Sequence, residues 1–171
     1  MLNNMALFQS FWTKPAINNR WKTEGQLEAN IWIAALSCCL LAKHGIPVTM
    51  HTDDFGKELL QHLPYTEIKT TLNKIPEDTP IGQWAVSKFY AQLEHPLGDI
   101  HIDNDVLIGS KELYEEMCNS RYDVIVQSVE YTGLVGKNFY KIPEKLLLEG
   151  KVISKPVSAA AYNCGIIGFK N

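Results

Sequence analysis

The strongest candidate for chemistry in this sequence is a pair of aspartates, Asp103 and Asp105, which flank Asn104 directly after the apolar stretch 100–102. Two carboxylates this close repel each other, and a divalent cation would relieve the repulsion. Such oxygen ligands suit Mg²⁺ or Mn²⁺, which usually keep part of their coordination shell for substrate phosphates. The pattern therefore predicts a metal site for a phosphate-bearing ligand. Asp and Asn are also common turn residues, so a plain turn is the alternative.

The elements that would position this pair alternate between strands and helices. Period-two or apolar runs predict strands at 5–9, 46–52, 67–72, 98–103 and 122–129. Helical spacing predicts helices at 24–44, 55–63, 81–93, 111–118 and 143–149. This order predicts one α/β domain over residues 1–171, with a mostly parallel central sheet and helices on both faces.

Polar residues follow several of these strands. Gln9 and Ser10 lie at the end of the first strand, Asp53 follows the second, and Asp103 lies at the end of the fourth. Ligands bind beyond the carboxyl ends of parallel strands, so we expect these side chains to share one edge of the sheet. Asp53 is equally well suited to cap the helix at 55–63, and Ser110 to cap the helix at 111–118.

Composition excludes several classes of protein. The 171 residues are 46% hydrophobic and 20% charged, and the net charge of −3 leaves no basic excess for a nucleic-acid partner. The longest apolar run, 31–42, is shorter than the roughly 20 residues of a membrane span. No secretory signal begins the chain, which favours the cytoplasm. The four cysteines lack C-x-x-C spacing, so we expect free thiols.

Four segments together resemble a known family. They are the strand and loop 6–12, the step Thr52-Asp53, the helix 84–93 with Ser87 and Lys88, and the Asn-x-Gly segment 163–168. With the His-Ile-Asp-x-Asp-Val segment 101–106, their order resembles bacterial nucleotide-sugar glycosyltransferases of the GT-A fold. Such enzymes are often encoded among polysaccharide-biosynthesis genes.

The resemblance implies a Rossmann-like GT-A domain that binds a nucleotide-diphospho-sugar donor with Mn²⁺ or Mg²⁺. Asp105 would bind the metal directly, and Asp103 would approach the ribose or a metal-bound water. The implied donor-binding residues are Gln9, Ser10, Phe11, Trp12, Asp53, Lys88, Asp103, Asn163 and Gly165. The implied reaction is sugar transfer to a glycan or lipid-linked acceptor, which would place the protein in the cytoplasm or at the inner face of the membrane.

The same resemblance implies that a third metal ligand, the catalytic residue and the acceptor part lie beyond Asn171. We therefore expect an amino-terminal part of a longer enzyme, in which no catalytic residue is identified. A sugar-nucleotide-binding domain without turnover is one alternative. A haloacid-dehalogenase-type phosphatase with Asp103 as nucleophile is a weaker one, because Leu107 stands where that family usually has Thr or Val.

Several candidate residues also have structural interpretations. His101 is expected to be packed or hydrogen-bonded rather than a metal ligand. Trp32 and Trp84 have helical core spacing and are expected to pack, whereas Trp12 is the better candidate for stacking on a ligand. Lys88 is as well explained by a solvated surface lysine as by a donor-phosphate contact.

Overall fold

The strands of the sheet form where the sequence concentrates apolar residues that become buried, such as Leu7, Val48 and Ile100. The computed structural model describes residues 5–95, 98–131 and 160–169. These fall into two units, Met1–Ile125 with Gly165–Asn171, and Val126–Cys164. The strands are β1 (Leu7–Phe11), β2 (Val48–Thr52), β3 (Glu67–Lys69), β4 (Ile100–Ile102), β5 (Val124–Tyr131) and β6 (Ala160–Phe169).

The sheet is mixed, with the strand order β3-β2-β1-β4-β6-β5. Strands β3, β2, β1 and β4 are parallel, as predicted, with Phe8 opposite both Thr49 and His101. Strand β6 pairs antiparallel with β4, so that Ile100 lies opposite Gly168. The prediction of a mostly parallel sheet is therefore confirmed only for the four strands from β3 to β4.

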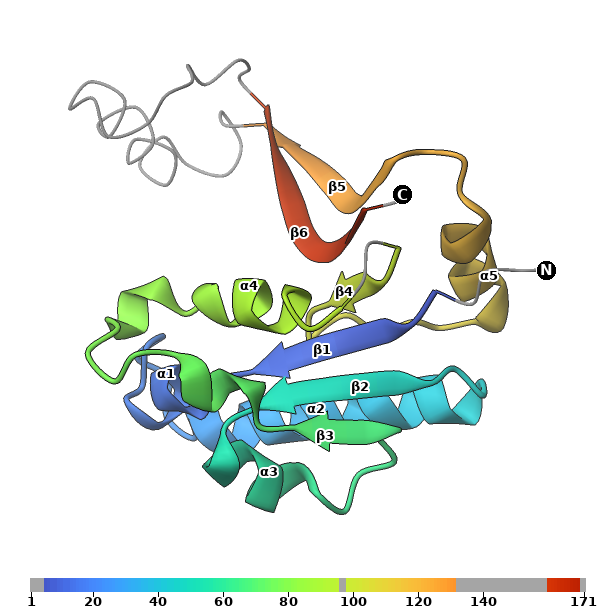
Figure 1. Cartoon of the computed structure of the whole chain (residues 1–171). Helices are drawn as coiled ribbons and strands as arrows, with labels where there is room; N and C mark the ends of the chain where they lie inside the picture. The colour runs from blue at the N-terminus through green and yellow to red at the C-terminus, as the bar shows by residue number, and fades with distance from the viewer. Residues whose placement is uncertain (1–4, 96–97, 132–159, 170–171) are drawn as a thin grey trace. The chain divides into compact units, whose positions relative to one another are not determined.

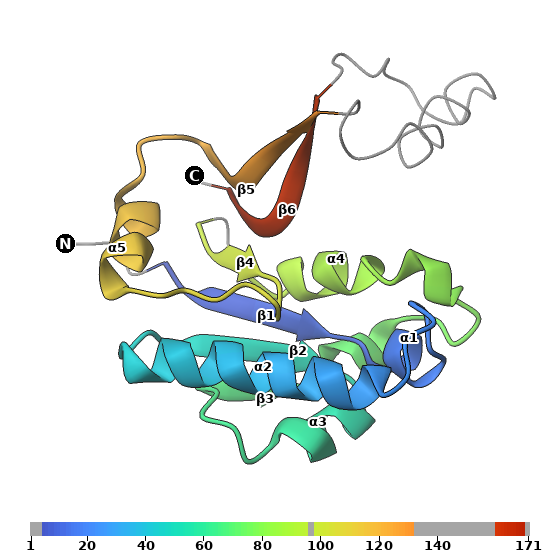
Figure 2. The same cartoon turned by 180° about the vertical axis from the view of Figure 1, so that it is seen from behind.

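Alternation along β1 separates two faces of the sheet. Leu7 packs in a buried cluster with Cys38 and Leu41 of α2 (Gln26–Lys43). Helix α2 runs behind the strands in Figure 1 and in front of them in Figure 2, so it covers this face. On the opposite face, Ser10 contacts Ser87 of α4 (Val86–Gln92). Helices thus lie on both faces, as the sequence predicts.

Local chemistry sets the helix boundaries close to those predicted. Helix α2 ends before Gly45, which adopts the left-handed φ of +67° that favours glycine. Asp53 caps α3 (Asp54–Leu60) by accepting a hydrogen bond from the amide of Gly56 at 2.8 Å. Ser110 caps α5 (Lys111–Asn119) by accepting from the amide of Leu113.

Short helices account for most differences from the predicted elements. The segment after β1 contains α1 (Thr13–Ile17), a helix that is not among the predicted elements. The strand predicted at 67–72 ends at Lys69 and gives way to the 3₁₀ helix η1 (Thr71–Lys74). The helix predicted at 81–93 is split into η2 (Ile81–Gln83) and α4. The helix predicted at 143–149 lies outside the described residues.

A cluster of imidazoles lies beside Phe8. His51 of β2 and His95 share a hydrogen bond of 2.7 Å between their Nε2 atoms, and His95 Nδ1 lies 2.7 Å from Asp99 Oδ2. The Phe8 ring stacks on His95 with 3.9 Å between centroids. Burial, and secondarily the charge of His95, lowers the pKa of His51 to about 4. The fold therefore holds His51 neutral near pH 7.

Candidate functional site

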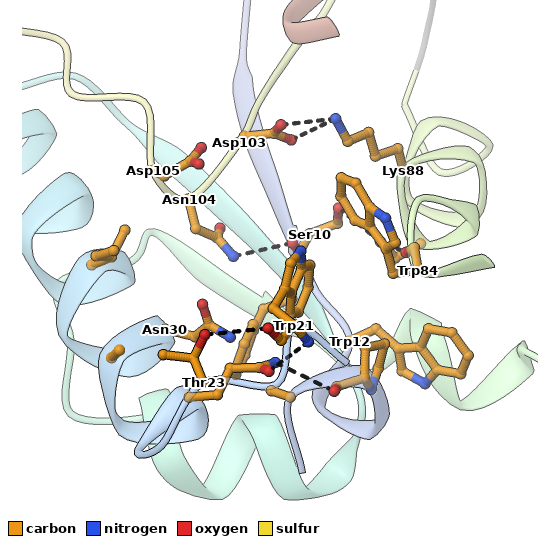
Figure 3. Close-up of a pocket in the computed structure, with 17 residues that line it drawn as sticks. Ser10, Trp12, Trp21, Thr23, Asn30, Trp84, Lys88, Asp103, Asn104 and Asp105 are labelled. Atoms are coloured by element: carbon orange, nitrogen blue, oxygen red, sulfur yellow. Dashed lines mark hydrogen bonds and ion pairs between the residues drawn. The ribbon is translucent and has the colours of Figure 1, made fainter. Parts of the chain in front are cut away.

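A pocket of about 400 Å³ opens where β1 and β4 end (Figure 3). Ser10, Phe11 and Trp12 contribute the end of β1, and the segment after β4 contributes Asp103 and Asp105. Lys88 reaches the same space from α4. This is the carboxyl edge of the parallel strands, where ligands of α/β folds usually bind. Six of the predicted site residues are therefore brought together.

The other wall of the pocket comes from residues outside the predicted set of donor-binding and metal-binding residues. The loop after α1 and the first turns of α2 supply Trp21, Thr23 and Asn30, and α4 with the residues just before it supplies Trp84 and Ser87. The rings of Trp21 and Trp84 lie 5.8 Å apart between centroids and are tilted by 58°. Indole rings and hydroxyls around carboxylates suit a ligand that is partly planar and partly polar.

The tryptophan assignments need correction. Trp84 was expected to pack in the core, but it is half-buried and lines the pocket. Trp32 was also expected to pack, but it is 75% exposed on α2. Both predictions are wrong because helical spacing identifies a face of a helix without showing what covers that face. Trp12 borders the pocket but is largely buried in a cluster with Leu72 and Ile75, so its stacking on a ligand stays a prediction.

Asp103 forms an ion pair with Lys88 at the mouth of β4. The Lys88 Nζ atom lies 2.8 Å from each carboxylate oxygen, as the dashed lines of Figure 3 mark. The side chains of Lys88 and Asp103 are only 18% and 24% exposed. Burial raises the pKa of Asp103 above its usual value, although the Lys88 ammonium opposes the rise; Asp105 adds to it. Lys88 therefore supplies a positive charge that offsets part of the cost of burying this carboxylate.

The Asp-Asn-Asp segment is a turn as well as a pocket wall. The amide of Val106 donates to the carbonyl of Asp103 at 3.0 Å, which closes the turn. Asn104 Nδ2 donates to the carbonyl of Ser10 at 3.2 Å and ties the turn to β1. The Asn104 Oδ1 atom is buried and has no hydrogen-bond partner among the described residues. The exposed Asp105 faces the pocket. The turn interpretation is correct, and it is compatible with a site.

His101 is buried and hydrogen-bonded, as predicted. Its Nε2 atom lies 3.0 Å from the Ser10 hydroxyl, and its Nδ1 atom lies 3.8 Å from Asp103 Oδ1. Burial, followed by the charge of Lys88, lowers the pKa of His101 to about 3. The imidazole is therefore neutral near pH 7.

Gln9 and Asp53 do not line the pocket. The Gln9 amide is fully buried, where its Nε2 donates to Ser37 Oγ at 2.9 Å and its Oε1 accepts from the Tyr65 hydroxyl. Asp53 accepts from the backbone amide and the hydroxyl of Thr13 in addition to its capping bond. Both side chains hold neighbouring elements in place. The capping role of Asp53 is predicted from the sequence, whereas its bonds to Thr13 and the contacts of Gln9 are not.

The predicted Asn-x-Gly segment is divided between the two units. The carbonyl of Gly165 accepts a hydrogen bond of 2.7 Å from the amide of Asp103, so β6 extends the pairing up to the first aspartate. Asn163 belongs to the second unit. Gly165 thus contributes to the site through its backbone, by fixing the point at which β4 ends.

The chemistry of the donor set fits a hard divalent cation. Asp103 and Asp105 supply carboxylate oxygens, the ligands that Mg²⁺ and Mn²⁺ prefer. Lys88 contacts both oxygens of Asp103, so a metal at this carboxylate would compete with the lysine ammonium. Within residues 5–95, 98–131 and 160–169, no group of three or more His, Cys, Asp or Glu side chains is arranged to hold a metal. Two protein ligands match a cation that is completed by ligand phosphates and water.

Comparison with known protein families identifies the family of this chain. Residues 5–171 match the model of a family described as a family of unknown function (DUF6734). No curated protein and no solved structure matches the chain. Over the described part of the chain, no helix has the length and apolar character needed to cross a membrane.

Proposed function

The chain belongs to the DUF6734 family of unknown function, and from the geometry of its pocket we propose that it binds a nucleotide-diphospho-sugar together with Mn²⁺ or Mg²⁺. One observation carries the proposal: paired carboxylates, a lysine and indole rings line one pocket at the carboxyl edge of parallel strands. A diphosphate needs cations, a nucleobase needs a flat apolar surface, and a sugar needs polar partners. This combination meets the three needs together.

Each group of residues has a proposed role. Asp103 and Asp105 would hold the cation, which when bound neutralises the diphosphate and stabilises the charge on a leaving nucleoside diphosphate. Lys88 would contact a phosphate oxygen. Its Nζ atom lies 2.8 Å from the Asp103 carboxylate, so it is close to the proposed metal and to the phosphates that the metal would bind. Trp12, Trp21 and Trp84 would provide the stacking surfaces.

The proposed reaction is transfer of the sugar to a glycan or lipid-linked acceptor, by a protein that works in the cytoplasm or at the inner face of the membrane. The polar side of the pocket supports a sugar-bearing ligand, whereas the acceptor is proposed from the resemblance to GT-A enzymes alone.

Titration calorimetry with Mn²⁺ and a panel of UDP- and GDP-sugars tests the proposal. We expect binding that requires Mn²⁺ and that falls at least about tenfold in Asp105→Ala, in line with the loss of a charged contact. Asp54→Ala is the matched control, because Asp54 is an exposed carboxylate outside the pocket. Absence of binding by every member of the panel contradicts the proposal.

Product analysis then separates the candidate reactions. Release of the nucleoside diphosphate with the sugar attached to an added acceptor supports transfer. Binding without turnover supports a sugar-nucleotide-binding domain. Hydrolysis of a generic phosphate ester that is lost in Asp103→Asn supports the phosphatase instead.

A further inference from the structure

The hydroxyl of Ser10 is the only group at hydrogen-bond distance from the His101 imidazole among the interactions of the described residues. Its Oγ atom lies 3.0 Å from Nε2. His101 is 1% exposed, and its Nδ1 atom is buried without a hydrogen-bond partner. The nearest acidic atom to Nδ1 is Asp103 Oδ1, at 3.8 Å. The two ring nitrogens therefore face groups of opposite character.

This arrangement selects one tautomer of the neutral ring. With the proton on Nδ1, an N–H dipole points toward the carboxylate of Asp103, which is favourable. With the proton on Nε2, the lone pair of Nδ1 would face the same carboxylate, which is repulsive. The Nδ1–H tautomer leaves Nε2 as a hydrogen-bond acceptor, so the Ser10 hydroxyl donates a hydrogen bond to Nε2. No change in the charge of His101 is involved.

The neighbouring hydroxyl of Ser87 has its proton engaged as well. Ser87 Oγ donates to the carbonyl of Trp84 at 3.1 Å, and it lies 3.4 Å from Ser10 Oγ. Both serines line the pocket. Both hydroxyl protons are thus engaged in hydrogen bonds within the protein, to His101 and to the Trp84 carbonyl. The two serine oxygens can therefore act toward a ligand only as acceptors.

We propose that Ser10 and Ser87 are specificity-determining residues that accept hydrogen bonds from a hydroxyl of the ligand, and that His101 is the positioning residue that fixes this polarity. Phosphate and carbonyl oxygens have no proton to donate and are disfavoured at this point of the pocket. Lys88, which lines the same pocket, can only donate hydrogen bonds and has the opposite preference. The ligand therefore has its anionic end at Lys88 and a hydroxyl-bearing part, a sugar or ribose, at Ser10.

The assignment of that hydroxyl to a sugar nucleotide rests on the proposed function, but the polarity of Ser10 does not. Histidine tautomers are read directly from ¹⁵N chemical shifts of ¹⁵N-histidine-labelled protein, without any ligand. We expect His101 to be neutral and protonated on Nδ1, and we expect Asp103→Asn to raise the Nε2–H fraction, because the carboxylate no longer favours Nδ1–H. An Nε2–H tautomer in the unaltered protein overturns the inference.

Calorimetry with two probes tests the ligand class. In Ser10→Ala and in Ser87→Ala we expect the affinity for the tightest sugar nucleotide of the panel to fall about three- to tenfold, the usual effect of one neutral hydrogen bond. Affinity for Mn²⁺ with pyrophosphate, which has no hydroxyl group, is expected to stay unchanged. Ser120→Ala, outside the pocket, is the control variant.

The outcomes separate failure of the inference from failure of the proposed function. Equal losses for both probes, or no loss for either, overturn the assignment of the two serines. If no sugar nucleotide binds at all, the proposed function fails, and the ¹⁵N measurement still decides the polarity of Ser10. Thermal unfolding of each variant checks that the altered proteins are folded.

Discussion

Lys88 Nζ lies 2.8 Å from both oxygens of the Asp103 carboxylate, so the cation of a side chain stands where a metal ion is proposed to bind. The two cations would repel each other at this distance. Binding of a divalent ion and release of Lys88 toward a phosphate would therefore favour each other, as linked equilibria do.

Removal of the Lys88 charge is expected to change metal affinity and stability in opposite directions. In Lys88→Met, Mn²⁺ without other ligands should bind more tightly, because no ammonium competes for Asp103. The free energy of unfolding should fall by about 1–3 kcal/mol, the usual effect of a charged hydrogen-bond partner lost from a partly buried group. Calorimetry and urea denaturation measure the two effects.

Two variants control for the loss of a lysine. Lys88→Arg keeps the charge and should retain the weaker Mn²⁺ binding, while Lys111→Met removes an exposed lysine paired with Glu115 and should change neither quantity. Unchanged or weaker Mn²⁺ binding in Lys88→Met would show that the two cations do not compete.

Asp53 is expected to matter for stability rather than for ligand affinity. Asp53→Ala removes the cap of α3 and two hydrogen bonds to Thr13. The loss should be about 1–3 kcal/mol in urea denaturation, and sugar-nucleotide affinity should stay within about twofold. Asp54→Ala, whose side chain is exposed, is the comparison. A stable Asp53→Ala protein with much weaker ligand binding would restore the predicted contact with the donor.

Asp53 illustrates which features of the site the sequence predicts and which it does not. Short-range chemistry was readable: Asp53 was expected to cap α3, and it does. The sequence did not show that the Asp53 side chain lies outside the pocket, because its place depends on contacts between distant segments. Asp53 points to Thr13 of α1, a five-residue helix that is too short to show a hydrophobic period.

The same reason explains the pocket residues that were missed. Trp21 precedes α2 and Trp84 precedes α4, and they meet only because both segments fold over the end of β1. The antiparallel pairing of β6 with β4 was also missed, because an apolar strand of this kind carries no signal of its direction.

Stability is expected to fall as the solution is acidified below pH 6.5. The pKa of His51 is lowered to about 4 and that of His101 to about 3, so the unfolded chain binds these protons more readily than the folded one. The free energy of unfolding should rise from pH 4 to 6.5 and then level off, with a slope of up to about 1.4 kcal/mol per pH unit for each histidine. Burial raises the pKa of Asp103, which gives a trend of opposite sign.

The histidine cluster allows this pH dependence to be assigned. His51 faces His95 and Thr71, with the charged groups of Lys69, Lys74 and Glu94 also acting on it. His51→Gln cannot gain a proton in the unfolded state, so urea denaturation between pH 4.5 and 7 should show a smaller slope than in the unaltered protein. An equal slope in both proteins would assign the acid sensitivity to other groups.

Gly56 is expected to be intolerant of any side chain, because α3 packs closely on the end of β2. A Cβ atom at this position would lie 1.9 Å from Thr52 Oγ1 and 3.1 Å from Thr13 Cγ2. The Thr52 hydroxyl cannot move away freely, since it is buried and donates to the carbonyl of Phe11 at 2.6 Å. Gly56→Ala should therefore lower the free energy of unfolding by about 2–4 kcal/mol through overpacking and loss of that bond. Gly82→Ala, where a Cβ atom meets nothing within 4 Å, should have little effect. Similar urea midpoints for the two variants would mean that α3 can shift away from β2, and the sheet edge beside Phe11 would then be less rigid than these contacts indicate.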